Sequence, residues 1–107
     1  MNGYQVTFFL QQDRRHGRQQ MHEWLMQTAK SLGIRGSTAV MAAEGYGHSG
    51  KRHSMHFFEL ADQPIEVTIA MDEGQAQALF EVLEREKANL FYVKSVVEFG
   101  TVGGAPG

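Results

Sequence analysis

Residues 45–53 carry the side chains of this sequence that are best suited to binding chemistry. Glycines at every second or third position let backbone N–H groups approach a ligand closely. Lys51 and Arg52 supply positive charge that pairs with phosphate, and no carboxylate interrupts the stretch. This composition predicts an anion site, although it would also suit a solvated surface loop. The candidate ligand-binding residues are Gly45, Tyr46, Gly47, His48, Lys51, Arg52 and His53.

The stretch is not a P-loop, and its histidines leave a second hypothesis open. The spacing Gly-x4-Gly-Lys-Ser/Thr is absent, because Arg52 stands where a P-loop has the hydroxyl that holds magnesium. Two of the side chains His48, His53 and His56 could instead share zinc, copper or nickel, the metals that imidazole suits. The alternative function is therefore a divalent-metal-binding protein of the cation-tolerance type, which uses loop histidines.

The composition excludes several other classes of function. The chain has 107 residues, 42% of them hydrophobic and 21% charged, which is typical of one globular domain. It has no cysteine, so disulfides, thiolate nucleophiles and cysteine-based zinc sites are excluded. The formal charge of −2 disfavours nucleic acid as a partner, and Gly-x-Ser-x-Gly is absent. No apolar run approaches the roughly 20 residues of a membrane span. We expect a cytoplasmic protein that is not an enzyme, has no cofactor and does not insert into a membrane.

Hydrophobic periodicity predicts an α+β domain in residues 1–100 and a flexible tail in residues 101–107. Period-two alternation indicates strands, and apolar residues three and four apart indicate helices. Gly33 suits the end of the first helix, and Asp72 with Gln75 suits a capping box at the start of the second. Residues 44–54 match neither period and are predicted to form a long exposed loop. We expect strands at 4–10, 36–43, 65–71 and 92–99, a short extended piece at 55–60, and helices at 18–32 and 72–88.

This order is βαββαβ, the ferredoxin-like plait, in which an antiparallel sheet carries two helices on one face. The other face of the sheet then needs a cover. In the strands predicted most strongly it holds a mixed set of side chains, too polar for a core but apolar enough for a contact between subunits. We therefore expect association through this face, which would hold Gln5, Thr7, Phe9, Glu66, Thr68 and Ala70.

The sequence resembles a PII-like signalling family, domain of unknown function 190, in the nitrogen-regulatory PII superfamily. The resemblance spans most of the chain, from the first strand to Phe99. Its most specific part is the Gly-aromatic-Gly of residues 45–47 with a histidine downstream. The other matching stretches are Asp13-Arg14-Arg15-His16-Gly17-Arg18, Glu23-Trp24-Leu25, Gly33-Ile34-Arg35-Gly36-Ser37-Thr38 and Gln63-Pro64-Ile65-Glu66-Val67.

The resemblance implies a homotrimer of ferredoxin-like subunits. PII relatives bind adenine nucleotides in the clefts between subunits. A long loop after the second strand, the T-loop, reports the ligand state to a partner, often a membrane transporter. In this sequence the loop corresponds to residues 45–54.

Two departures bear on the nucleotide site. Family members often carry Arg-Gly late in the second strand, where this chain has Met41-Ala42, so one possible phosphate partner is missing. Gln19-Gln20 replaces the Pro and Leu that are common at the start of the first helix. The sequence predicts a trimeric sensor of a small anionic effector, with an adenine nucleotide as the favoured ligand.

Overall fold

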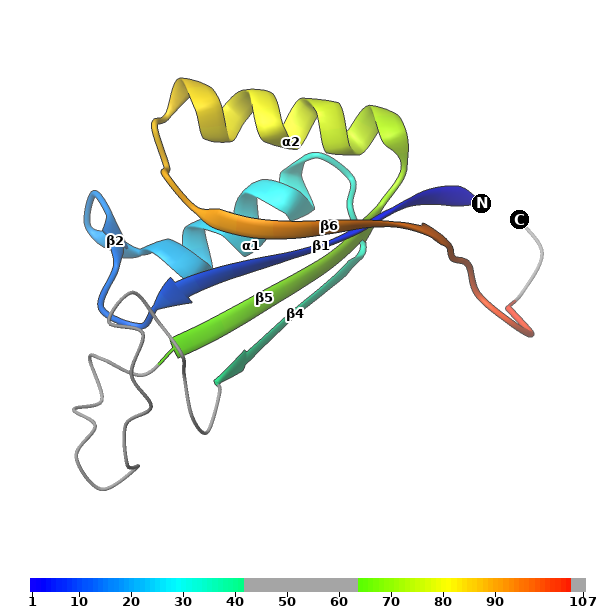
Figure 1. The fold of residues 1–107 in the computed structure, drawn as a ribbon, viewed down its shortest axis with the longest axis horizontal. Coiled ribbons are helices and arrows are strands. Elements are labelled where there is room, and N and C mark those ends of the chain that lie inside the picture. The colour runs from blue at the N-terminus through cyan, green and yellow to red at the C-terminus, as the bar shows by residue number, and fades with distance from the viewer. Residues whose placement is uncertain (42–63, 105–107) are drawn as a thin grey trace.

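The computed structural model describes residues 1–41 and 64–104. In Figure 1 the helices pack against a twisted main sheet. The predicted βαββαβ plait is confirmed, with one added hairpin. The predicted loop 44–54 and extended piece 55–60 lie outside the described residues. The elements are β1 (Asn2–Gln11), β2 (Arg15–His16), β3 (Gln19–Gln20), α1 (Met21–Ser31), β4 (Gly36–Met41), β5 (Pro64–Met71), α2 (Glu73–Arg85) and β6 (Phe91–Glu98).

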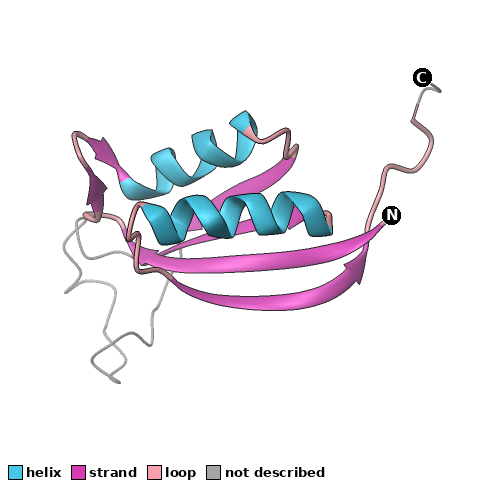
Figure 2. Ribbon diagram, turned by 90° about the horizontal axis from the view of Figure 1, so that it is seen from above, coloured by secondary structure: helices cyan, strands magenta, loops and turns pink. Residues whose placement is uncertain are grey.

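The main sheet has the strand order β4-β5-β1-β6, and every neighbouring pair is antiparallel. Both helices lie on the same face of the sheet, as the view from above makes plain (Figure 2). Val6 of β1 stands opposite Ile69 of β5 and Lys94 of β6. These registers fix which side chains share a face, because successive residues of a strand point to opposite sides.

The core lies between the helices and the sheet. β5 alternates as predicted, with Ile65, Val67, Ile69 and Met71 buried and the residues between them half-buried. From the helices, α1 contributes Leu25 and Ala29, and α2 contributes Ala76, Leu79 and Leu83. Phe80 of α2 is partly buried against this core. One apolar stripe on each helix is therefore enough to cover one face of the sheet.

Helix α1 begins later than the periodicity predicts, at Met21 and not at residue 18. Gln19 and Gln20 belong to β3, so the hairpin takes up what would be the first helical turn. The Gln20 side chain makes no capping hydrogen bond, while the Met21 amide donates to the Arg14 carbonyl at 2.8 Å. The hairpin backbone thus replaces a side-chain cap.

Helix α2 begins as predicted and ends earlier. The Gln75 amide donates to Asp72 Oδ1 at 2.7 Å, and the Asp72 amide donates to Gln75 Oε1 at 3.0 Å, which is a complete capping box. The helix ends at Arg85, three residues before the predicted residue 88, because Lys87 adopts a left-handed φ of 53°. In the part of the chain that is described, no helix is long and apolar enough to cross a membrane.

Candidate functional site at the loop end of the sheet

The predicted ligand-binding residues lie outside the described residues. This holds for all seven, from Gly45 to His53, and for His56 of the metal hypothesis. The described strands nevertheless fix where this segment leaves and rejoins the sheet. Met41 stands opposite Ile65, and Gln11 opposite Pro64. The segment therefore starts and finishes at the end of the sheet where β1 ends, called here the loop end.

A small hairpin, β2–β3, lies at the loop end, where the sequence predicts only a connection (Figure 1). Arg15 pairs with Gln20 and His16 with Gln19, leaving a two-residue turn. Gly17 takes the first turn position with a φ of 64°, which tight hairpin turns assign to glycine. Two-residue strands have no measurable periodicity, so Gly17 was the one available signal for the hairpin.

The hairpin is tied to the connection between α2 and β6. Arg14 donates from Nη2 to the Ala88 carbonyl at 2.7 Å and from Nη1 to the Asn89 carbonyl at 3.4 Å. His16 Nε2 lies 3.0 Å from Glu86 Oε1, and its ring stacks on Trp24 with centroids 3.9 Å apart. His16 is not among the candidate ligand-binding or metal-binding residues predicted from the sequence. The contact was missed because Glu86 lies 70 positions away in the chain.

The α2–β6 connection has a constrained backbone. Lys87 and Asn89 both have a φ of 53°, and Ala88 between them is buried. The Lys87 amide donates to Glu84 O at 3.1 Å and the Ala88 amide to Leu83 O at 3.0 Å, which is a Schellman ending for α2. The constrained turn presents the Lys87 side chain to solvent.

Positive charge therefore gathers at the loop end. Arg15, Arg18 and Lys87 are exposed there beside the exposed carboxylate of Asp13, and Arg14 is bound to two carbonyl groups. The carboxylate of Glu86 is engaged by His16. Basic side chains beside a constrained backbone turn can attract and hold an anionic group. Within residues 1–41 and 64–104, no three His, Asp or Glu side chains are grouped to hold a metal ion.

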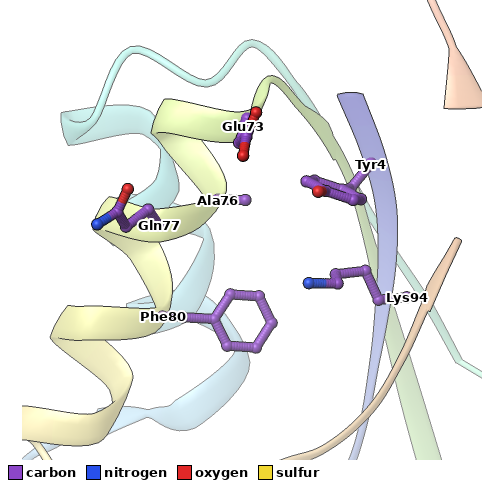
Figure 3. A pocket seen from close by; sticks show the side chains of 6 residues that line it. All are labelled: Tyr4, Glu73, Ala76, Gln77, Phe80 and Lys94. Carbon is purple, nitrogen blue, oxygen red and sulfur yellow. The ribbon is translucent and has the colours of Figure 1, made fainter. Parts of the chain in front are cut away.

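A recess of about 280 Å³ lies near the opposite end of the sheet, between α2 and β6 (Figure 3). The Lys94 ammonium points across it, 4.5 Å from the centre of the Tyr4 ring and 5.7 Å from that of Phe80. The Glu73 carboxylate stands at its rim. The lysine already uses both aromatic rings as cation–π partners, so the charge that it brings to the recess is partly engaged.

Comparison with known families gives a match that spans nearly the whole chain. The model of the family DUF190, described as an uncharacterized ACR, matches residues 3–98. The chain belongs to this family. The resemblance that the sequence predicts is thereby confirmed. Among curated proteins, none matches this sequence.

Solved structures with the same fold are PII-like proteins. A putative PII-like signaling protein from Thermus thermophilus is 18% identical, with a TM-score of 0.61 over 91% of this chain and 86% of its own. CPII, a nitrogen regulatory PII-like protein from Thiomonas intermedia, was solved bound to ADP, AMP and bicarbonate. It is 19% identical, with a TM-score of 0.60 over 91% of this chain and 89% of its own. The apo form of CPII is 16% identical and has a TM-score of 0.55, covering 91% and 92% of the two chains. The DUF190 chain described here thus has the PII-like fold.

Proposed function

We propose that this protein is a PII-like sensor that binds an adenine nucleotide in clefts between the subunits of a homotrimer. The observation that carries the proposal is the shared fold with CPII, which was solved with ADP and AMP. The basic loop end gives local support, because the phosphate-pairing loop residues lie in the segment that leaves from it. The protein works as a regulator and not as an enzyme, with the nucleotide as its effector.

In the proposed site, different loop residues contact different parts of the nucleotide. Backbone N–H groups around Gly45 and Gly47, with Lys51 and Arg52, hold the phosphates, as donors and cations do in other phosphate sites. Tyr46 stacks on the base or lines the cleft. The site is completed by His48 and His53 as hydrogen-bond donors. At the loop end, the exposed Arg15, Arg18 and Lys87 add a positive field that favours an anionic ligand.

The trimer in this proposal forms through the sheet face that carries no helix. That face exposes large apolar side chains, with Phe91 64%, Val40 55% and Val93 50% accessible. Apolar patches that are rimmed by polar groups commonly mark interaction sites. A domain of about 100 residues rarely encloses a deep private pocket, so a cleft between subunits is the natural place for a nucleotide.

Nucleotide binding then acts through the loop. A ligand shifts a conformational equilibrium only by its difference in affinity for the two states. Phosphate contacts made by Lys51 and Arg52 favour the loop conformation that supplies them. That conformation presents a different surface to a regulated partner, such as a membrane transporter.

Isothermal titration calorimetry with AMP, ADP, ATP and cyclic nucleotides tests the nucleotide site. Replacing Lys51 and Arg52 together by Ala should weaken binding at least about tenfold, because two phosphate-pairing charges are lost. The matched control replaces Lys30 and Arg35 by Ala, which removes the same charge at the opposite end of the sheet. The proposal fails if none of the nucleotides binds at millimolar concentration, or if both double variants bind like the wild type.

A further inference from the structure

The sheet face opposite the helices, called here the open face, has an unusual charge pattern. Glu66 is the one ionisable side chain on it in the strands that the structure describes. The register places Val40 and Phe9 on either side of Glu66, and Phe91 beyond Phe9. In the next row, Thr7 and Thr68 hydrogen-bond to each other through their hydroxyls at 3.1 Å. A single carboxylate therefore stands on a central strand of an otherwise uncharged surface.

This pattern differs from that of a sheet face in water. The solvated face of an antiparallel sheet is polar, because the apolar residues of each strand point to the core. The open face instead pairs the rings of Phe9 and Phe91, with centroids 5.7 Å apart, and Phe91 is largely exposed. Both helices lie on the other side of the sheet, so no described helix covers these rings (Figure 2). The face has the composition of a surface that is covered in an assembly.

The occupant that best fits the open face is the same face of other copies of this chain, as in the proposed homotrimer. The face has no positive charge to attract an acidic partner, and only one negative charge to attract a basic one, in the strands described. Four strands about 4.8 Å apart, each of about eight residues rising about 3.3 Å, span about 500 Å². Covering this face in the proposed homotrimer takes about 500 Å² of each subunit out of water. This step rests on the assembly in the proposed function.

We propose that Glu66 makes association through the open face dependent on protons. When a second copy covers the face, the ionised carboxylate loses water and meets no cationic partner among the described residues. The neighbouring side chains from β4 and β1 are Val40 and Phe9, those from β6 are Phe91 and Val93, and none of these titrates. From the strands that the structure describes, each further copy brings to the face only its own Glu66. Proton uptake removes the cost of burying the charge, so the assembled form binds more protons than the separate subunits and association strengthens as the pH falls.

Sedimentation equilibrium of the full chain, from about pH 8 to about pH 5, tests this inference. The wild-type dissociation constant should fall with pH, by up to about tenfold per pH unit for each proton taken up. Glu66→Gln keeps the shape of the side chain and removes the charge. This variant should associate tightly over the whole range, with most of the pH dependence gone.

Histidine is the side chain whose ordinary pKa lies in this pH range, so the control keeps all five histidines of the chain. Glu81→Gln removes one carboxylate from the exposed side of α2 and should keep the wild-type pH dependence. If Glu66→Gln and the wild type show the same pH dependence, the role of Glu66 is wrong while the assembly stands. If the wild type is monomeric at every pH, the assembly itself is wrong and the role of Glu66 falls with it. Circular dichroism of both variants checks that the fold is retained.

Discussion

At the scale of single residues, the two helix ends form a natural comparison. Both helices end in a Schellman motif, which contains one residue in the left-handed conformation. This residue is Gly33 after α1, with a φ of 82°, and Lys87 after α2, with a φ of 53°. Glycine adopts this conformation without a steric penalty, whereas a residue with a Cβ is strained by about 1 kcal/mol. The residue with the strained backbone is thus Lys87, whose side chain places a positive charge at the loop end.

Replacing Lys87 by Gly should raise the free energy of unfolding by about 0.5–1 kcal/mol, because it relieves the left-handed strain. Urea denaturation with linear extrapolation measures the change. The reverse exchange, Gly33→Ala, introduces the same strain after α1 and should lower stability by about 1 kcal/mol. A loss of stability in Lys87→Gly would contradict the prediction and indicate that the lysine side chain stabilises the fold.

At the scale of elements, the hairpin and the α2–β6 connection behave as one unit. They are far apart in sequence, and the bonds from Arg14 to two carbonyl groups join them. The stack of His16 on Trp24 fixes the hairpin to α1 as well. Positioning of the basic loop end therefore depends on side chains that themselves need not contact a ligand.

Replacing Arg14 by Met keeps the aliphatic length and removes the donors to Ala88 and Asn89. The part-buried Ala88 carbonyl then loses a charged partner, so we expect a loss of about 1–2 kcal/mol in stability. Hydrogen exchange of the amides from residue 88 to residue 90 should speed up along with it. Arg18→Met is the control from the same hairpin, with its side chain exposed, and should change stability by less than about 0.5 kcal/mol. Equal effects of the two substitutions would contradict the role of Arg14.

The main elements could be predicted from the sequence because each satisfies a local rule. The alternation over β5 and the Asp72–Gln75 box depend on residues close together in the chain. The β2–β3 hairpin could not be predicted in this way, because its contacts to Glu86 and Ala88 span about 70 positions. The candidate site was defined by composition alone, and its seven residues stay a prediction. Spacing along one chain carries no information on how a second subunit completes a cleft.

At the scale of the whole molecule, the fold and the proposed site are separable. Met41 and Ile65 stand opposite each other on neighbouring antiparallel strands, so a two-residue turn can join them directly. The helices and the sheet registers lie on either side of this junction. The strand pairings of the described domain are thus all made without the segment that carries the predicted ligand-binding residues.

A shortened chain in which Asn-Gly joins Met41 to Ile65 should fold and should not bind nucleotide. Circular dichroism and a single cooperative unfolding transition would show the retained fold. Calorimetry with ADP should give no heat of binding, because the loop glycines, Lys51 and Arg52 are gone. Wild-type affinity in the shortened chain would place the site on the described domain and contradict the loop assignment.

Among the strands that the structure describes, the order β4-β5-β1-β6 leaves β4 and β6 as the edges of the main sheet. Backbone groups along a free edge accept another strand, and joining the β6 edge of one copy to the β4 edge of the next links subunits head to tail. Such a series ends only by closing into a ring; otherwise it grows into a filament. Ring closure would therefore protect this protein against polymerisation. Lys94, a charged residue in the middle of the β6 edge strand, is the kind of side chain that discourages open-ended growth.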